Sequence, residues 1–297
     1  MRVCVVFNPT ARGDKARRFL RRLEPLAREC ALKPTTAAGS AVGLAAEAVR
    51  EGFETIVAAG GDGTVNEVLN GIAKADHGLE RARLGVLPLG TMNVFAKDLG
   101  LPSGLDAAWR LIREGRERSI DLPWAEFHVG GQPARRCFAQ LAGAGLDSRA
   151  IGFVNWAWKI KVGPLAYAVA GLRALRGRQP RVTVVLPDGT RASGELALVG
   201  NGTLYGGWVT MFPGACANDG KLDIRLLPRV GALALFQFAR SWLFRGGFAV
   251  PGEQHLRTDR FTLSSDEAIP FQLDGDNAGP LPARFLVEPG ALRVVAP

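Results

Sequence analysis

The sequence lacks the features that define several protein classes. It has no apolar run near 18 residues, so we expect no membrane-spanning helix. Its four cysteines form no Cys-x-x-Cys pair and have no regular spacing, which argues against a disulfide framework or a zinc site. The three histidines are scattered, and Met1–Phe7 is typical of a strand rather than of a signal peptide. These absences predict a globular, cytoplasmic protein.

Two common nucleotide-binding motifs are also absent. No Gly-x-x-x-x-Gly-Lys-Ser/Thr segment occurs, which argues against a P-loop enzyme. The spacing of Gly61, Gly63 and Asn66 misses the dinucleotide-binding fingerprint at its third glycine. No repeat or low-complexity linker is visible, and 297 residues are enough for two domains.

The charge balance, 37 basic against 28 acidic residues, gives a net charge of +9. Such an excess fits nucleic acid, phosphorylated small molecules or an anionic membrane surface, and solvated arginine-rich helix surfaces are an equally simple explanation. Basic residues are not interleaved with aromatic ones in the manner of RNA-binding modules. We therefore expect no nucleic-acid partner.

The first 122 residues alternate between strand and helix patterns. The expected strands are 2–7, 32–36, 55–59, 84–87 and 118–122. The expected helices are 14–30, 42–51, 64–74, 92–99 and 105–114. This alternation predicts an α/β domain with a parallel sheet that is covered by helices on both faces.

From residue 123 to 287 the pattern changes to short strands bounded by turn residues. Gly130-Gly131 and Asp188-Gly189 are typical of hairpin turns, and a helix is expected at 165–176. The expected strands are 125–129, 136–141, 181–186, 195–199, 221–227, 260–263, 271–273 and 283–287. This half is predicted to be a mainly antiparallel β-sandwich domain, and the cleft between the two domains is the default ligand site.

Three loops of the first domain follow strands whose carboxyl ends share one edge of the expected sheet. They are Asn8–Lys15, Gly60–Thr64 and Pro88–Asn93. The glycines allow a close backbone approach and positive φ, and the N–H groups at a helix start face an anion. Thr64 is the expected N-cap, with Glu67 as its capping-box partner. A tight turn that binds nothing is the alternative for any one loop.

The motifs resemble those of a known family. Asn8-Pro9, the segment from Gly60 to Glu67 and the segment from Gly90 to Ala96 are similar to the N-terminal signatures of the diacylglycerol kinase catalytic-domain superfamily. That group includes soluble bacterial lipid kinases and the sphingosine and ceramide kinases. The likeness continues through 138–147, 206–207, 219–223 and 273–276, so it covers nearly the whole chain. It implies ATP and Mg²⁺ as co-substrates, a lipid alcohol as acceptor, and a C-terminal tail (288–297) that returns to the first domain.

The resemblance and the demands of phosphoryl transfer together suggest roles for individual residues. Asp274 is the expected base and Asp62 the organiser of Mg²⁺, and the reverse assignment stays open. The expected metal-binding carboxylates are Asp62, Asp121, Asp219 and Asp223, although a type I turn is the alternative for the last two. The expected nucleotide-binding residues are Asn8, Lys15, Gly60, Gly61, Gly63, Thr64, Asn66, Glu67, Gly90, Thr91, Asn93 and Asp276.

Two positions depart from the family pattern, and the acceptor stays open. Val94 stands where the family often has Asp, with Asp98 one helical turn further, and Asp276 replaces a Glu. Diacylglycerol is the first candidate acceptor, and ceramide or a sphingoid base is the runner-up. The sequence also admits a soluble-metabolite kinase of the NAD type and a non-catalytic lipid or nucleotide sensor.

Two stretches combine large apolar residues with cations, at 153–161 and 236–245. Such stretches suit the interface of an anionic membrane, which predicts peripheral association with its inner face. The alternative is that Trp242, Phe244 and their neighbours pack inside the protein. The oligomeric state stays open, with a homodimer as one option.

Overall fold

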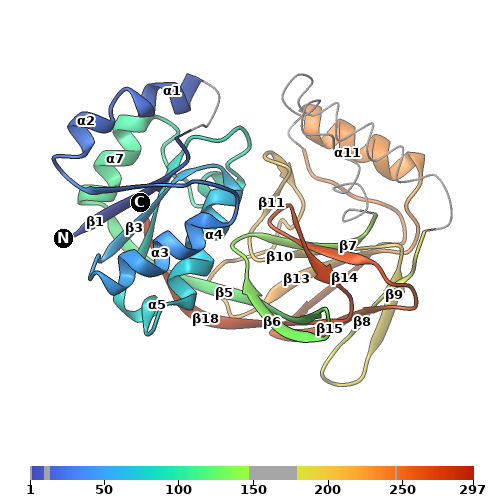
Figure 1. Ribbon diagram of the computed structural model, residues 1–297. Helices are drawn as coiled ribbons and strands as arrows, with labels where there is room; N and C mark the ends of the chain where they lie inside the picture. Colours follow the sequence, from blue (N-terminus) through green and yellow to red (C-terminus); the bar gives the residue numbers. More distant parts are fainter. Residues whose placement is uncertain (1, 10–13, 147–178, 245) are drawn as a thin grey trace. The chain divides into compact units, whose positions relative to one another are not determined.

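The structure is a computed structural model that describes residues 2–9, 14–146, 179–244 and 246–297. The chain forms two compact units (Figure 1). The N-terminal unit comprises residues 1–122 together with 289–297, and the sandwich unit comprises residues 123–288. The expected domain limits were 1–122 and 123–287, with a tail from 288. Each unit is described by itself below.

The N-terminal unit is built on a parallel sheet with the strand order β2-β1-β3-β4. Its strands are β1 (Val3–Phe7), β2 (Ala31–Pro34), β3 (Thr55–Gly60) and β4 (Arg83–Pro88). β1 and β3 are buried along their whole length, as expected for continuous apolar strands that are covered on both faces. The end of β18 (Ala283–Ala296) continues the sheet, with Val294 beside Leu84 in parallel register. The predicted α/β architecture is confirmed.

Seven helices surround this sheet in the described part of the unit. The helices α3 and α4 pack against each other on one face (Figure 1). Side chains of α1, α2 and α7, such as Phe19 and Ile112, pack with Val5 and Val57 on the other face. The helices are α1 (Asp14–Leu20), α2 (Leu23–Leu26), α3 (Ser40–Arg50), α4 (Asp62–Lys74), α5 (Gly78–Arg81), α6 (Val94–Asp98) and α7 (Leu105–Glu114).

Several expected element limits were wrong. The single helix expected at 14–30 is two short helices, and α5 was not predicted. The two strands expected at 118–122 and 125–129 are one strand, β5 (Arg116–Val129). A proline cannot donate to a ladder, but the carbonyl oxygen of Pro123 accepts from the N–H of Phe138 at 3.1 Å. The strand therefore continues through it.

The sandwich unit contains two large sheets, each with antiparallel pairing between neighbouring strands wherever the register is described. One sheet has the order β14-β13-β10-β7-β16-β17. Its strands are β7 (Leu141–Gly145), β10 (Leu196–Gly200), β13 (Leu222–Leu227), β14 (Gln254–Thr258), β16 (Pro270–Leu273) and β17 (Asp276–Pro280). The other joins β5 and β18 with β6 (Gln132–Cys137), β8 (Val182–Val185), β9 (Arg191–Gly194) and β15 (Arg260–Ser265). The predicted β-sandwich is confirmed.

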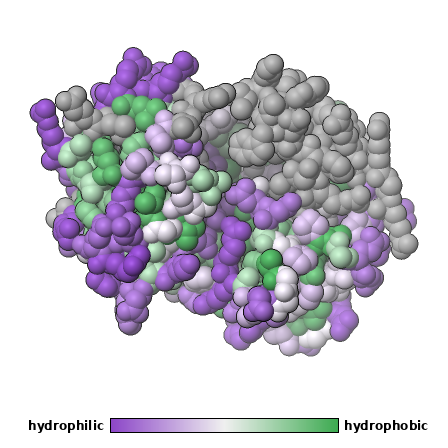
Figure 2. All heavy atoms as spheres, viewed as in Figure 1, coloured by the Kyte–Doolittle hydropathy of each residue, from purple (hydrophilic) through white to green (hydrophobic). Residues whose placement is uncertain are grey.

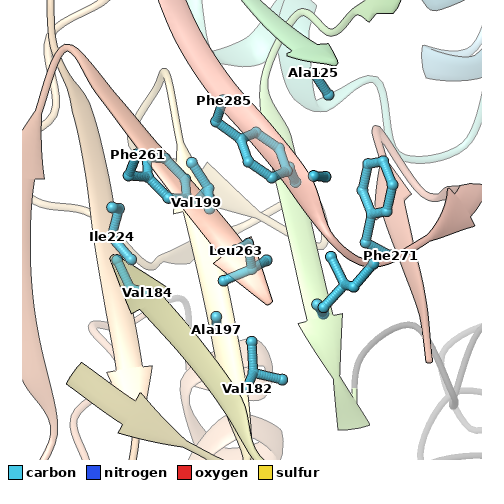
Figure 3. Packing of buried hydrophobic residues seen from close by; sticks show 14 of the residues in the cluster. Ala125, Val182, Val184, Ala197, Val199, Ile224, Phe261, Leu263, Phe271 and Phe285 are labelled. Atoms are coloured by element: carbon cyan, nitrogen blue, oxygen red, sulfur yellow. The ribbon is translucent and has the colours of Figure 1, made fainter. Parts of the chain in front are cut away.

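Aliphatic side chains and phenylalanine rings fill the core of the sandwich (Figure 3). The rings of Phe261 and Phe285 are stacked with their centroids 4.9 Å apart, and Phe271 meets Phe285 edge-on at 5.7 Å. Alternating buried and partly exposed residues along β8 mark it as a strand with one face toward this core. Burial of this cluster is what holds the two sheets face to face.

A smaller cluster lies against the helix α11 (Ala232–Phe244) and the short hairpin of β11 (Leu204–Tyr205) and β12 (Val209–Thr210). Among the described residues, no helix is long and apolar enough to span a membrane. On the face drawn in Figure 2, hydrophilic residues cover much of the coloured surface, with hydrophobic residues in small areas between them. The helix expected at 165–176 lies outside the described residues.

Candidate active site

The loops after β3 and β4 lie side by side at one end of the parallel sheet. Gly60 and Pro88, the last residues of the two strands, are paired in register. The carbonyl oxygen of Gly60 accepts hydrogen bonds from the N–H groups of Leu89 (2.9 Å) and Gly90 (3.2 Å). This edge of a parallel sheet, beyond the carboxyl ends of the strands, is where α/β proteins bind ligands.

Close packing requires glycine at two positions of these loops, Gly60 and Gly90. A Cβ atom on Gly90 would lie 2.5 Å from Cα of Gly61, so the two backbones touch. A Cβ atom on Gly60 would lie 2.3 Å from Oγ1 of Thr64. The expected need for positive φ was wrong: Gly61 has φ −94°, and Gly60, Gly63 and Gly90 are also outside the left-handed region. At Gly60 and Gly90, glycine is needed because a Cβ atom would have no room, and not because φ is positive.

Asp62 joins the glycine loop to the loop after β4. It is the first residue of α4, and its Oδ1 accepts the N–H of Phe95 at 3.2 Å. Phe95 is the second residue of α6, so the carboxylate satisfies one of the free N–H groups at that helix start. One oxygen of the predicted metal-organising residue is therefore already used to position α6.

Asn93 shapes the loop that precedes α6. It has φ 47°, a left-handed conformation that asparagine tolerates better than most residues. Its Nδ2 donates to the carbonyl oxygens of Gly90 (2.7 Å) and Pro88 (3.3 Å). Its Oδ1 is buried and has no hydrogen-bond partner among the described residues. The loop thus keeps one buried acceptor for a donor that the described chain does not supply.

The expected capping box of α4 was wrong. The N-cap is Gly61, without a side-chain hydrogen bond, and Thr64 lies inside the first turn. Glu67 instead accepts the N–H groups of Gly39 (2.9 Å) and Ala41 (3.1 Å), at the start of α3. An anionic carboxylate is favourable at the positive end of a helix. Glu67 therefore ties α4 to α3, a contact between distant segments that sequence spacing does not reveal.

The other expected nucleotide-binding residues occupy different settings. Asn66 is 2% exposed, and its Oδ1 accepts from Nδ2 of Asn70 at 3.1 Å, within α4. Asn8 and Thr91 are exposed at the loops after β1 and β4, and Gly63 is half-buried in α4. Lys15 lies on α1, and its side chain is outside the described part of the structure. Asn66 is thus placed to support the helix, whereas Asn8 and Thr91 are accessible.

Asp274 lies in the turn of the β16–β17 hairpin. Leu273 and Asp276 are paired across the two strands, so Asp274 and Gly275 form a two-residue turn. Both have positive φ, 49° and 93°, as a type I′ turn requires, and Asp-Gly is among the sequences that favour it. Asp276 lies exposed at the start of β17. The requirements of a hairpin turn are therefore sufficient to explain the sequence Asp274-Gly275.

The carboxylate of Asp274 is held by three backbone N–H groups. Its Oδ2 accepts from Ala139 at 2.7 Å, and its Oδ1 accepts from Gln140 at 2.9 Å and Leu141 at 3.0 Å. Both carboxylate oxygens are thus fixed in orientation by the main chain of residues 139–141. Nothing in the sequence indicated these donors, because they belong to the main chain.

Asp121 does not lie at the end of a strand, which corrects the expectation. It lies in the middle of β5, is 1% exposed, and accepts the N–H of Gly290 at 2.8 Å with its Oδ1. Gly290 has φ 62° and belongs to the tail that β18 brings into the N-terminal unit. The carboxylate therefore anchors that tail.

Asp219 and Asp223 both bind Arg257. The guanidinium contacts Oδ2 of Asp219, and its Nε lies 3.5 Å from Oδ2 of Asp223. Oδ1 of Asp219 accepts the N–H of Lys221 at 3.0 Å, which is the turn geometry that Asp favours. Burial raises the pKa of Asp223, Asp219 adds to the rise, and Arg257 opposes it. A metal at these two carboxylates stays a prediction that requires Arg257 to move.

Across the described residues, no three His, Cys, Asp or Glu side chains are grouped to hold a metal ion. Mg²⁺ in kinases needs only one or two carboxylates because the phosphates supply the other oxygens. The touching glycine loops, the helix start at Asp62 and the buried Oδ1 of Asn93 fit a phosphorylated nucleotide. These residues therefore suit a nucleotide that binds together with its Mg²⁺ ion. They suit a metal ion that is held by protein side chains alone less well.

Comparisons with known proteins agree with this geometry. Residues 2–125 match the model of the diacylglycerol kinase catalytic domain. Residues 140–296 match the YegS C-terminal NAD kinase beta sandwich-like domain. A diacylglycerol kinase of Bacillus subtilis (strain 168) is 33% identical over 307 aligned positions, which cover 100% of this chain and 96% of the relative. The chain belongs to the diacylglycerol kinase family.

Other members of the diacylglycerol kinase family support the assignment. A diacylglycerol kinase of Staphylococcus carnosus (strain TM300) is 30% identical over 96% of this chain and 92% of its own length. A crystal structure of a diacylglycerol kinase from Bacillus anthracis str. Sterne superimposes with a TM-score of 0.76. It covers 100% of this chain and 97% of that chain at 24% identity, which shows the shared fold.

Of the two stretches predicted to contact a membrane, 153–161 lies outside the described residues. The second lies on α11, where Phe244 is 74% exposed. The side chain of Trp242 is not described. The interpretation that Phe244 packs inside the protein was therefore wrong.

Proposed function

We propose that this protein is an ATP- and Mg²⁺-dependent lipid kinase that transfers the γ-phosphate to the hydroxyl group of a lipid such as diacylglycerol. The observation that carries the proposal is the contact between the glycine loop and the loop after β4, at Gly61 and Gly90. A Cβ atom on Gly90 would lie 2.5 Å from Cα of Gly61, so a side chain there would force the two loops apart. The relatives' names supply the acceptor class.

The residues of the N-terminal unit would bind and orient the nucleotide. The N–H groups in the first turn of α4 have no acceptor within the helix and would bind phosphate oxygens. Asp62, the first residue of α4, would organise the metal. The buried Oδ1 of Asn93 would accept a hydrogen bond from the nucleotide. Bound Mg²⁺ would neutralise charge on the phosphates.

Asp274 would receive the proton of the attacking hydroxyl. Its three N–H donors fix the orientation of the carboxylate, which would place it to accept a hydrogen bond from an alcohol. In the exchanged assignment Asp62 would receive the proton, although its Oδ1 already accepts the N–H of Phe95. Activity of Asp274→Asn distinguishes the two assignments.

The test is transfer of labelled phosphate from ATP to diacylglycerol, ceramide, sphingosine and monoacylglycerol in mixed micelles, with NAD as a soluble control. The wild type and Asp274→Asn are compared in the presence of Mg²⁺. Labelling of a lipid that the substitution abolishes supports the proposal and names the acceptor. Labelling of NAD alone would move the protein to the soluble-metabolite kinases. ATP binding without any transfer would favour a non-catalytic sensor.

A further inference from the structure

One helix carries most of the exposed apolar side chains in the described part of the chain. Six large hydrophobic residues are exposed among the described residues, and four of these six lie on α11. We call these four the α11 apolar face: Leu233 (56% exposed), Phe236 (65%), Leu243 (66%) and Phe244 (74%). Exposed apolar residues that gather in this way mark an interaction surface.

The spacing of the four residues places them on one side of the helix. Leu233 and Phe236 are three residues apart, and Leu243 and Phe244 follow about two turns after Phe236. Arg240 is exposed on the same side, four residues after Phe236. The side chains that repeat at helical spacing thus form a stripe with a cation at its centre.

The opposite side of α11 already packs against the protein. Phe238 meets Tyr205 edge-on at 5.6 Å and Phe248 at 6.2 Å. The Oγ of Ser241 donates to the carbonyl oxygen of Gly247 at 2.7 Å, and Ala234 is buried. One side of α11 therefore holds the helix against the rest of the unit, and the α11 apolar face takes no part in that packing.

The charge around α11 has one sign. Residues 228–252 contain no Asp or Glu and three arginines, at positions 229, 240 and 245. Arg229 and Arg240 are exposed. A helix with apolar and basic groups on its outer side is complementary to an anionic bilayer, where the apolar groups enter the acyl boundary and the cations remain among the head groups.

We propose that α11 docks the protein on an anionic lipid bilayer through Leu233, Phe236, Leu243 and Phe244. This inference rests on the proposed function, since a long-chain lipid substrate resides in a bilayer. Docking would hold the enzyme at the surface that supplies the acceptor. It would raise the apparent affinity for a lipid in a membrane without changing the chemistry of transfer.

The test is co-sedimentation of the full chain with vesicles of phosphatidylglycerol and phosphatidylcholine, and with phosphatidylcholine alone. The double variant Phe236→Ser/Phe244→Ser is compared with the wild type. We expect the variant to bind anionic vesicles at least about tenfold more weakly. Its melting temperature should not fall, because both side chains are exposed. The matched control is Val129→Ser, which removes an exposed apolar side chain (50%) on the β5–β6 hairpin.

Two further measurements separate this inference from the kinase activity. With a short-chain diacylglycerol dissolved as monomers, the double variant and the wild type should transfer phosphate equally. With diacylglycerol embedded in anionic vesicles, the variant should be at least about tenfold slower. If neither protein phosphorylates any lipid but the variant still loses vesicle binding, the docking surface stands and the proposed function fails.

Three outcomes would overturn the docking surface. Equal vesicle binding by the variant and the wild type is the first. The second is a wild-type dimer in solution that the double variant converts to monomers, which would make α11 an interface between two copies. The third is an equally large loss of binding in Val129→Ser.

Discussion

Asp274 and Leu141 exchange two hydrogen bonds. The N–H of Asp274 donates to the carbonyl oxygen of Leu141 at 2.8 Å, and the N–H of Leu141 donates to Oδ1 of Asp274 at 3.0 Å. One residue is in the turn of a hairpin, and the other begins β7. Main chain and side chain thus fix the carboxylate together, so it cannot rotate without giving up bonds to an ionised group.

We expect Asp274→Asn to reduce phosphate transfer by about 10²–10⁴-fold, the usual contribution of a positioned base. Asparagine tolerates the positive φ of this turn, so the hairpin should survive. Loss of the charge-assisted bonds should cost about 1–3 kcal/mol, visible as a lower melting temperature. Initial rates and thermal unfolding are measured together.

Asp188→Asn is the matched control for this substitution. Asp188 also precedes a glycine in a hairpin turn, and its Oδ1 accepts the N–H of Thr190 at 2.9 Å. It is exposed, so its replacement should leave the transfer rate unchanged. If both variants lost the same fraction of activity, Asp274 would have no special role in transfer.

Gly90→Ala tests the contact between the loops that follow β3 and β4. The new methyl group would lie 2.5 Å from Cα of Gly61 and 2.8 Å from Oδ1 of Asn93, so the loops must separate. We expect the KM for ATP to rise and the protein to lose about 1–3 kcal/mol of stability, as for other overpacked sites. Steady-state kinetics with varied ATP and thermal unfolding measure the two effects.

Gly43→Ala is the control for a glycine that is not crowded. Gly43 lies exposed in the middle of α3, and a Cβ atom there would meet nothing within 4 Å. Alanine favours a helix interior by about 0.5–1 kcal/mol over glycine, so this variant should be slightly more stable and fully active. An unchanged KM for ATP in Gly90→Ala would contradict the proposed role of the loop contact.

Local patterns predicted the interior strands of the parallel sheet and two hairpin turns well. The continuous apolar segments indicated β1, β3 and β4, because both faces of a parallel sheet are covered and burial leaves no alternation. The turns at Gly130-Gly131 and Asp188-Gly189 were found because positive φ selects glycine at such positions. Each of these patterns involves residues that are close together in the sequence.

Contacts between distant segments were not predictable from spacing. Glu67 sits three residues after Thr64, as in a capping box, yet its partners are Gly39 and Ala41 on another helix. The three N–H groups around Asp274 leave no mark in the sequence, since every residue except proline has one. Arg257 was not foreseen as the partner of Asp219 because 38 residues separate them. Residue type and motif spacing can propose candidates for the site, but the partners of each candidate depend on the fold.

Glu67→Gln should loosen the link between α4 and α3. A glutamine has one acceptor oxygen and no charge, so it satisfies at most part of the carboxylate's role at Gly39 and Ala41. We expect a loss of about 1–2 kcal/mol in unfolding free energy, measured by denaturant titration. Glu51→Gln is the control, since it removes an ion pair with Lys33 at a partly exposed site and should change stability by less than about 1 kcal/mol. Equal effects in the two variants would argue against the helix link.

Metal binding distinguishes the two interpretations of Asp219 and Asp223. With Arg257 in place, we expect added Ca²⁺ to leave the melting temperature of the wild type unchanged at this site, because the guanidinium already neutralises both carboxylates. Arg257→Gln leaves the carboxylates uncompensated, so Ca²⁺ should raise its melting temperature by mass action. A rise in the wild type that Asp219→Asn removes would show that the ion displaces Arg257.

The pair of Arg225 and Glu253 predicts a specific dependence of stability on pH. Arg225 is 1% exposed, contacts Oε2 of Glu253 and donates to the carbonyl oxygen of Met211 at 2.7 Å. Burial opposes ionisation of Glu253, but hydrogen bonds from Arg225 and His255 outweigh it, and the pKa of this carboxyl lies below its ordinary value. A lowered pKa in the folded state stabilises the protein fully above the unfolded-state value of about 4.3, and that contribution disappears as the pH falls through the folded-state pKa.

Glu253→Gln should therefore be several degrees less stable than the wild type at neutral pH, because it leaves the buried guanidinium uncompensated at a cost of about 3–5 kcal/mol. The difference in melting temperature should shrink below a pH of about 4, where the wild-type carboxyl also becomes neutral. Thermal unfolding of both proteins from acidic to neutral pH measures this convergence, with the exposed Glu267→Gln as control. A difference that stayed constant with pH would mean that Glu253 contributes by its shape and not by its charge.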